Sequence, residues 1–193
     1  MSFEYYDKNP DKFYGDTVHV DMGEFYQAFL PFVRDGGKIL DVGCGSGRDL
    51  QKFKNLGYEP VGIDASIEMV KKAKALSGVK VLNLKFNEIT WENEFDGLWA
   101  SASLLHVPVN EISNTIKLLW KTLKRSSPFF MSFKYGANSY TKNDRHFQNY
   151  TEVTVEPILD NLEDRKLEKI WTTADKRLNR KGENWLNLIL TKV

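Results

Sequence analysis

The sequence predicts an α/β fold in which an open, mostly parallel sheet carries helices on both faces. Three observations predict this fold. Between residues 38 and 133, short apolar runs alternate with segments whose apolar residues have helical spacing. The first apolar run ends in a turn with glycines at positions 43, 45 and 47. The last two apolar runs are joined without a helix, which predicts an antiparallel strand at the C-terminal edge of the sheet.

The first half of this alternation consists of three strands and two helices. Each strand is a short run rich in Val, Ile and Leu, as expected where both faces of a sheet are covered. Leu50 and Phe53 fall on one face of the first helix, and Gly57 ends it. Ser66 is expected to cap the second helix, and Gly78 to end it. The predicted segments are the strands Lys38–Val42, Glu59–Ile63 and Val79–Leu84 and the helices Ser46–Leu56 and Ser66–Ala75.

The second half adds two helices and four strands. Ile112 and Ile116 fall on one face of the first of these helices. Pro157 lies inside the second, which is therefore expected to start near Thr154, because proline is tolerated only in the first turn. The predicted segments are the helices Glu111–Lys124 and Thr151–Leu162 and the strands Gly97–Ala102, Pro128–Phe133, Lys169–Thr173 and Trp185–Thr191.

The chain shows no linker, so residues 1–193 are expected to form a single domain. Two segments of this domain lie outside the alternation of strands and helices. One is an aromatic N-terminal cap segment, residues 1–31. The other is a loop after the fifth strand, residues 136–150. Ligands bind at the carboxyl ends of the strands in open α/β sheets. Both segments are therefore expected to cover that edge, with residues 136–150 as a lid.

Composition excludes several classes of function. The chain has 193 residues, with 27 Lys and Arg against 26 Asp and Glu, so its net charge of +1 gives no general attraction to nucleic acid or anionic lipid. Cys44 is the single cysteine, which excludes an intrachain disulfide and a cysteine-based zinc site. No signal peptide or membrane-spanning run is visible. We expect a cytoplasmic protein without a bound metal, either a monomer or a weak homodimer.

The strongest functional signal lies in residues 39–47, ILDVGCGSG. Alternate glycines let the chain turn sharply and approach a ligand closely. Asp64, which lies 23 residues after Asp41, ends the second strand, where a carboxylate is placed to accept both hydroxyls of a ribose. A dinucleotide site usually has G-x-G-x-x-G, but Arg48 replaces the last glycine here. Asp41 suits the ammonium group of S-adenosylmethionine better than a pyrophosphate.

These residues resemble class I S-adenosylmethionine-dependent methyltransferases, most closely small bacterial stand-alone enzymes of the tellurite-resistance type. ILDVGCGSG matches the first motif of that family, VGIDAS (residues 61–66) its acidic loop, and FDGLWASASLLHVP (residues 95–108) its fourth-strand motif. The resemblance implies a Rossmann-like, seven-stranded sheet whose last strand is reversed. The chain departs from the family at Lys124-Arg125-Ser126-Ser127, where relatives usually carry a Pro-Gly-Gly turn.

The resemblance also implies the cofactor, S-adenosyl-L-methionine, and the residues that hold it. It assigns Asp41 and the glycines to the methionine end, Asp64 to the ribose, and a further group of residues to the adenine. The cofactor-binding residues expected on this basis are Asp41, Gly43, Cys44, Gly45, Asp64, Ala65, Ser66, Met69, Phe86, Asn87, Ala100 and Ser101.

Several of these residues also have a purely structural interpretation. Cys44 is expected to be a small packing residue rather than a nucleophile. For Asp64, capping of the following helix is the alternative to binding the ribose. Arg48 is either a ligand contact or a solvated residue of the first helical turn. The catalytic residues stay unknown, with His106, Arg145 and Tyr14 as candidates. Arg145 is placed to pair with an anionic substrate group, and a structural hydrogen bond is the alternative for His106.

The predicted reaction is in-line transfer of the methyl group to a small-molecule acceptor, which requires alignment more than a catalytic dyad. Residues 103–106, SLLH, replace the Asn/Asp-Pro-Pro-aromatic tetrapeptide of enzymes that methylate amino groups of DNA bases or glutamine. A protein that binds S-adenosylmethionine or S-adenosylhomocysteine without transferase activity is one alternative. A nicotinamide-dependent oxidoreductase is another, against which Asp41 and Arg48 argue.

Overall fold

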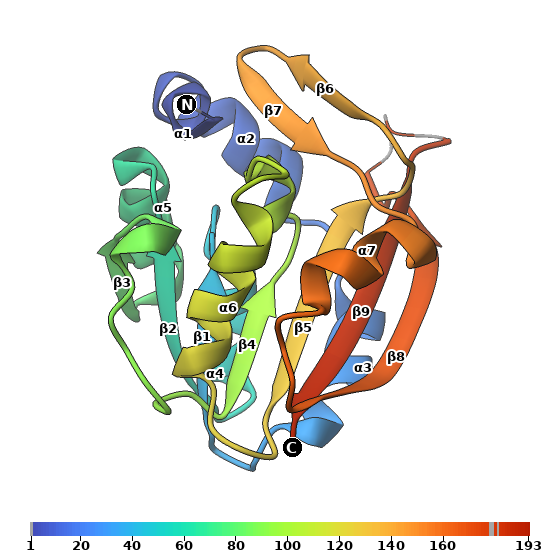
Figure 1. Cartoon of the computed structure of the whole chain (residues 1–193). Coiled ribbons are helices and arrows are strands. Elements are labelled where there is room, and N and C mark those ends of the chain that lie inside the picture. Colours follow the sequence, from blue (N-terminus) through green and yellow to red (C-terminus); the bar gives the residue numbers. More distant parts are fainter. Residues whose placement is uncertain (1, 178–179, 181) are drawn as a thin grey trace.

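A mostly parallel sheet forms the centre of the molecule (Figure 1). The computed structural model describes residues 2–177, 180 and 182–193, and within these residues seven strands pair in the order β3-β2-β1-β4-β5-β9-β8. Strands β1 to β5 are parallel, whereas β9 is antiparallel to both β5 and β8. The predicted fold class is thus confirmed. The strands are β1 (Lys38–Val42), β2 (Glu59–Asp64), β3 (Lys80–Asn83), β4 (Gly97–Ala100), β5 (Pro128–Lys134), β8 (Arg165–Ala174) and β9 (Asn184–Lys192).

Helices cover both faces of this sheet, because successive side chains of each strand point to opposite faces. On one face, Leu40 and Leu98 pack in the same core cluster as residues of α6 and α7. On the other face, Ile39 and Trp99 pack with Phe29 of α3. The helices are α1 (Ser2–Lys8), α2 (Pro10–Thr17), α3 (Gly23–Phe29), α4 (Arg48–Asn55), α5 (Ile67–Ser77), α6 (Ile112–Thr122) and α7 (Glu152–Leu159), with the 3-10 helices η1 (Leu30–Phe32), η2 (Phe86–Glu88) and η3 (Leu104–His106). None of the helices in the described part of the chain has the length and hydropathy of a membrane-spanning segment.

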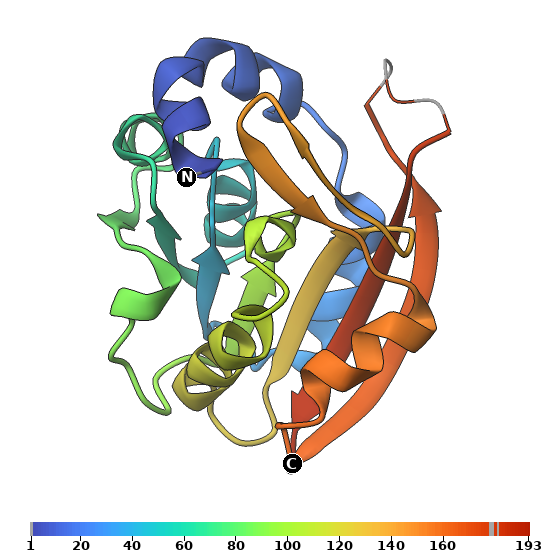
Figure 2. The same cartoon turned by 45° about the horizontal axis from the view of Figure 1, so that its top comes forward.

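The N-terminal segment divides into two parts with different roles. Helices α1 and α2 lie above the carboxyl ends of β1 and β2, beside the hairpin of β6 (Ser139–Lys142) and β7 (Arg145–Gln148) (Figure 2). Helix α3, by contrast, packs against the sheet, where Phe25, Tyr26 and Phe29 are buried. The cap expected over residues 1–31 is therefore shorter, because the apolar rings of α3 are part of the core.

Two local expectations differ from the structure. The segment expected to be a loop, residues 136–150, contains the hairpin β6–β7, whose turn residues Asn143 and Asp144 have φ of 50° and 58°. Two successive positive φ angles suit a tight hairpin turn. Helix α7 begins at Glu152, earlier than expected, so that Pro157 lies inside it. A reciprocal cap between Thr151 and Thr154 stabilises its first turn, whereas the proline removes one intrahelical hydrogen bond.

Candidate active site

The glycine turn after β1 is held by the end of the neighbouring strand. The N–H groups of Gly43 and Cys44 both donate to the carbonyl oxygen of Ile63, each at 2.9 Å. Gly43, Gly45 and Gly47 have φ of 74°, 51° and 82°, values that residues with a side chain rarely adopt. The turn therefore presents backbone groups, rather than side chains, at the carboxyl edge of the sheet.

Asp64 connects this turn to the next helix. Its Oδ2 accepts a hydrogen bond from the N–H of Gly45 at 2.9 Å, and its Oδ1 accepts one from the N–H of Ser66 at 2.9 Å. Ser66 caps α5 through the N–H of Met69 at 3.2 Å, so Asp64 is not the helix cap. Removal from water raises the pKa of Asp64 to about 6, although the backbone donors lower it.

A buried pair of carboxylates lies below the turn. Asp49 accepts hydrogen bonds from the Tyr26 hydroxyl at 2.5 Å and from Trp99 Nε1 at 2.9 Å, and Arg48 Nε binds it at 2.7 Å. Asp41 is only 2% exposed, and its Oδ2 has no hydrogen-bond partner in the part of the chain that the structure describes. Burial, followed by the charge of Asp49, raises the pKa of Asp41 well above its usual value. Asp41 is thus a buried acceptor with spare capacity.

Arg48, which the sequence left open, has a structural role in this arrangement. Its Nη1 donates to the carbonyl oxygen of Thr17 at 3.1 Å, and its Nη2 donates to Asp49 at 2.8 Å. The side chain therefore ties the end of α2 to the beginning of α4. Cys44 is 8% exposed and packs with Leu50 and other buried residues, and burial raises the pKa of its thiol well above the usual value. These observations fit a packing residue.

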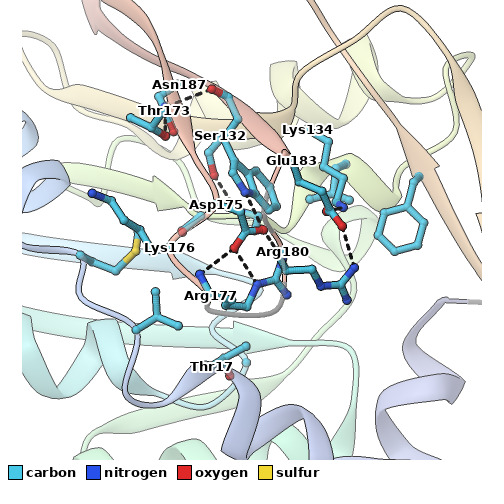
Figure 3. Close-up of a pocket in the computed structure, with 18 of the residues that line it drawn as sticks. Thr17, Ser132, Lys134, Thr173, Asp175, Lys176, Arg177, Arg180, Glu183 and Asn187 are labelled. Carbon is cyan, nitrogen blue, oxygen red and sulfur yellow. Dashed lines mark hydrogen bonds and ion pairs between the residues drawn. The ribbon is translucent and has the colours of Figure 1, made fainter.

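A cavity of about 580 Å³ extends from the glycine turn to the ends of β5, β8 and β9 (Figure 3). Ser132 and Asn187 line it from the sheet, and Met22 and Phe25 line it from the N-terminal segment. Asn187 is 1% exposed, and its Nδ2 donates to Thr173 Oγ1 at 3.0 Å. The cavity therefore continues from the glycine turn to a region lined by Ser132, Lys134, Glu183 and Asn187, which we call the second chamber.

The N-terminal helices and the hairpin meet over this cavity. The Tyr6 hydroxyl lies 2.7 Å from Nε2 of His106, and Nδ1 of His106 lies 2.6 Å from the carbonyl oxygen of His146 in β7. The Arg145 guanidinium stacks on the ring of Tyr5 at 4.0 Å. Burial lowers the pKa of His106 to about 4, so this imidazole is neutral near pH 7.

The sequence candidates fall into two groups in space. Of the catalytic candidates, His106 and Arg145 line the cavity, whereas Tyr14 does not and lies against Lys72, 5.0 Å from its Nζ to the ring. Tyr6, which the sequence analysis did not select, lines the cavity and contacts His106. Of the expected cofactor residues, those that line the cavity are Gly43, Cys44, Gly45 and Ser101.

The other expected cofactor residues lie outside the cavity wall. Met69 and Ala100 are buried, and Asn87 is an exposed residue of η2. Helix α1 lies across the acidic loop, where Asp7 accepts a hydrogen bond from Ser66 Oγ at 2.6 Å. Residues Ala65, Ser66, Met69, Phe86 and Asn87 thus follow one side of the sheet edge, away from the second chamber.

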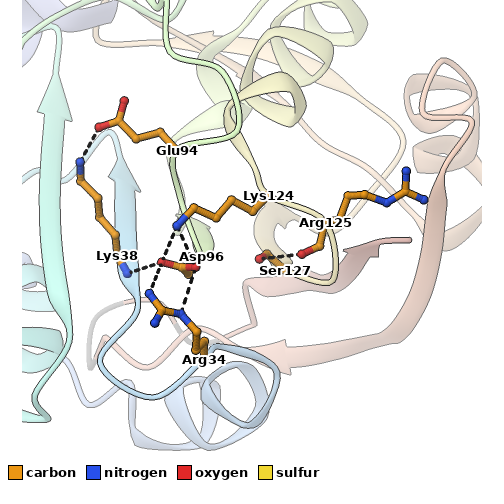
Figure 4. A network of polar contacts seen from close by, with 7 residues as sticks. All are labelled: Arg34, Lys38, Glu94, Asp96, Lys124, Arg125 and Ser127. Carbon is orange, nitrogen blue, oxygen red and sulfur yellow. Dashed lines mark hydrogen bonds and ion pairs between the residues drawn. The ribbon is translucent and has the colours of Figure 1, made fainter.

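The departure at residues 124–127 lies at the opposite end of the sheet (Figure 4). Lys124 Nζ binds both carboxylate oxygens of Asp96 at 3.1 Å, and Arg34 Nη2 binds the same carboxylate at 3.3 Å. Ser126 adopts a φ of 58°, and its N–H donates to the carbonyl oxygen of Lys192 at 2.6 Å. An ion-pair network therefore holds this loop, and none of its residues lines the cavity.

The glycine turn lies in a part of the chain that resembles known proteins. The sequence family described as "Methyltransferase domain" matches residues 39–126, which include the turn, Asp64 and the fourth strand. Residues 39–126 of the chain thus form a methyltransferase domain of the S-adenosylmethionine-dependent type. An uncharacterised methyltransferase of Staphylococcus carnosus is 28% identical to it over 154 residues, which are 72% of this chain and 74% of the relative.

Solved structures share the fold of this methyltransferase. The Burkholderia thailandensis 1,6-didemethyltoxoflavin-N1-methyltransferase, solved with 1,6-didemethyltoxoflavin and S-adenosylhomocysteine, superposes with a TM-score of 0.79 at 18% identity. That superposition covers 98% of this chain and 84% of the other. A TehB-like S-adenosylmethionine-dependent methyltransferase of Corynebacterium glutamicum superposes with a TM-score of 0.70 at 16% identity. This superposition covers 99% of this chain and 98% of the other. The cofactor of this methyltransferase is S-adenosyl-L-methionine.

Proposed function

We propose that this methyltransferase transfers the methyl group to a small-molecule acceptor bound in the second chamber of the cavity. The observation that carries the proposal is the continuity of the cavity. One space of about 580 Å³ reaches from Gly43 and Gly45 to Ser132 and Asn187. This volume lies in the range of small-molecule sites, and side chains rather than a flat surface enclose it. A monomer or weak homodimer in the cytoplasm stays a prediction from the sequence.

The residues of the glycine turn fit S-adenosyl-L-methionine. The free, buried Oδ2 of Asp41 is a suitable acceptor for an ammonium group, whose positive charge would favour the carboxylate form. Both oxygens of Asp64 keep spare acceptor capacity for ribose hydroxyls. When bound, the cofactor supplies an electrophilic methyl group on a positively charged sulfur. The remaining proposed cofactor residues are Gly43, Cys44, Gly45, Ala65, Ser66, Met69, Phe86, Asn87, Ala100 and Ser101.

His106 is the proposed proton acceptor where the reacting group of the substrate carries a proton. The carbonyl oxygen of His146 only accepts hydrogen bonds, so Nδ1 of His106 must hold the ring proton. Nε2 therefore has a lone pair, which accepts the hydrogen bond from Tyr6. Movement of α1 would free this nitrogen for the acceptor. Arg145 holds the lid by stacking on Tyr5 in this arrangement.

The experiment that tests this function separates small from large acceptors. The protein is first titrated with S-adenosylhomocysteine by calorimetry, with Asp41→Asn as the test variant and Asp35→Asn, an exposed change, as control. It is then incubated with cofactor labelled on the methyl group and either an ultrafiltered metabolite extract or the retained protein and nucleic acid. Label is expected in the small-molecule fraction and absent with Asp41→Asn. Label confined to the macromolecular fraction would contradict the proposal.

A further inference from the structure

The cavity concentrates the positive charge of the chain. Among the residues that the structure describes, seven Lys and Arg side chains line it, against three Asp and Glu, whereas the whole chain has a net charge of only +1. The rest of the chain therefore carries a small excess of negative charge, so the positive surplus is particular to the cavity. The cationic lining residues are Arg48, Lys134, Lys142, Arg145, Lys176, Arg177 and Arg180, and the acidic ones are Asp49, Asp175 and Glu183.

Three of these cations, Arg48, Lys176 and Arg177, each pair with a separate carboxylate, whereas two others share one. Arg177 pairs with Asp175 through Nη2 at 2.5 Å. Glu183, in contrast, is bound by Lys134 Nζ through one oxygen and by Arg180 Nη1 through the other, the latter at 2.9 Å (Figure 3). The second chamber therefore holds two cations that meet on a single negative charge.

Lys134 is a largely buried cation. It ends β5 in the wall of the cavity and is only 9% exposed. Its Nζ lies 5.6 Å from the ring centre of Phe147 and 5.9 Å from that of Trp185, and both rings also line the cavity. Aromatic faces compensate a buried cation only in part, so Lys134 requires an anionic partner.

Glu183 supplies that partner from the connection between β8 and β9. Its side chain is 34% exposed to solvent. Although partial burial acts in the opposite direction, Lys134 and Arg180 hold the pKa of Glu183 below its usual value. Glu183 is thus an ionised carboxylate at neutral pH, bound by two cations in the wall of the second chamber.

We propose that Lys134 and Arg180 form an anion-binding subsite for the methyl acceptor, and that Glu183 occupies this subsite when no acceptor is bound. The acceptor is then a small molecule with a carboxylate or phosphate group. The proposal rests on the proposed function, because it assigns a substrate class to the same cavity. An anionic acceptor also offsets the surplus positive charge of the cavity, to which the cofactor's sulfonium would add, and is attracted to the cavity from solution.

The test measures the binding of matched probes to protein saturated with S-adenosylhomocysteine. Benzoate and phenyl phosphate are the anionic probes, and benzamide is the neutral probe of the same shape as benzoate. We expect at least one anionic probe to bind more tightly than benzamide, with an affinity that falls as salt is raised. The two anionic probes distinguish a carboxylate from a phosphate acceptor. Equal affinity for benzoate and benzamide, together with no binding of phenyl phosphate, would overturn the proposal.

Substitutions with opposite expected effects locate the subsite. Glu183→Gln should tighten binding of the anionic probe roughly three- to tenfold, because it removes the competing carboxylate. Arg180→Gln should weaken binding by about the same factor, and Lys134→Gln serves as a second variant if it folds. Lys117→Gln, on the exposed side of α6, is the matched control and should leave binding unchanged. Weaker binding in both Glu183→Gln and Arg180→Gln would contradict a competing role for Glu183.

The outcomes for the subsite and for the proposed function are separable. If the protein binds S-adenosylhomocysteine but neither anionic probe, the result supports the cofactor site and contradicts the anion subsite. Protein that does not bind S-adenosylhomocysteine contradicts the proposed function, whereas probe binding that depends on Arg180 would still support the subsite.

Discussion

The Tyr6 hydroxyl lies 2.7 Å from Nε2 of His106, although one hundred positions separate the two residues in the chain. This contact joins α1 to the loop after β4, and the hydrogen bond from Nδ1 of His106 to the carbonyl oxygen of His146 extends it to the hairpin β6–β7. One imidazole thus connects both segments that cover the cavity. We therefore expect this connection to restrict the exchange of ligands at the glycine turn.

Replacement of Tyr6 by Phe should accelerate the release of S-adenosylhomocysteine. The ring would still pack on Phe13, whereas the hydrogen bond to His106 would be lost. Loss of one such bond costs about 1 kcal/mol, so that we expect roughly a fivefold rise in the dissociation rate, measured by stopped-flow displacement. Tyr14→Phe is the matched control, because the Tyr14 ring lies against Lys72 outside the cavity. Equal rates in both variants would show that α1 does not restrict the site.

Binding of S-adenosylhomocysteine should depend on pH through Asp64. Burial raises the pKa of this carboxyl to about 6, and a ribose hydroxyl donates to the carboxylate form. Affinity is therefore expected to be constant well above pH 6 and to fall as Asp64 is protonated below it. Asp64→Asn should bind several-fold more weakly and lose the part of the dependence centred near pH 6. Titration calorimetry across this range checks both, with Asp16→Asn as control, and a retained transition would assign it to another group.

Much of the fold could be predicted because its elements repeat local rules. Strand β1 has the bounds predicted for it, since a run of apolar residues between glycines suits a strand with two covered faces. The hairpin β6–β7 was not predicted, because its strands are short and β6 is exposed, which leaves no alternation of apolar and polar residues. Asn143-Asp144 was the one local signal for its turn.

The site was only partly predictable, for a physical reason. The glycine turn and Asp64 follow strands directly, so the ends of β1 and β2 must bring them together. Tyr6 and Glu183 reach the cavity through helix docking and strand pairing across long stretches of chain. No spacing in the sequence encodes such contacts. The sequence also does not distinguish Tyr6 from Tyr14, because tertiary packing decides which side of the N-terminal helices faces the cavity.

Replacement of Gly47 by Ala should destabilise the protein strongly. A Cβ at this position would lie 2.6 Å from Cα of Ala73, and the backbone φ of 82° is itself unfavourable for alanine. The two effects together should lower the free energy of unfolding by at least about 2 kcal/mol. Urea denaturation measures this, with Gly15→Ala as the control of opposite sign. Gly15 lies in α2, and no atom outside its own stretch of helix lies within 4 Å of its Cβ position, so alanine should stabilise that helix by up to about 1 kcal/mol.

Stability below neutral pH should depend on Asp96, which anchors the network of Figure 4. Burial raises its pKa, but the N–H of Lys38 and the side chains of Arg34 and Lys124 outweigh burial, so the folded pKa lies below the usual value. A lowered pKa stabilises the fold above the unfolded value of about 3.9, and this stabilisation is lost as pH falls through the folded value. Asp96→Asn should therefore cost about 1–2 kcal/mol near pH 7.

The pH dependence of the Asp96→Asn effect tests whether the charge of Asp96 causes the stabilisation. The difference in unfolding free energy between wild type and Asp96→Asn should shrink below pH about 4, because the wild-type carboxyl is then protonated as well. Urea denaturation at several pH values measures the difference, and Asp144→Asn, at the exposed hairpin turn, is the matched control. A difference that stays constant down to acidic pH would mean that Asp96 acts through its shape and its hydrogen bond to Lys38 rather than through its charge. Because the network lies away from the cavity, binding of S-adenosylhomocysteine near neutral pH should be unchanged in both variants.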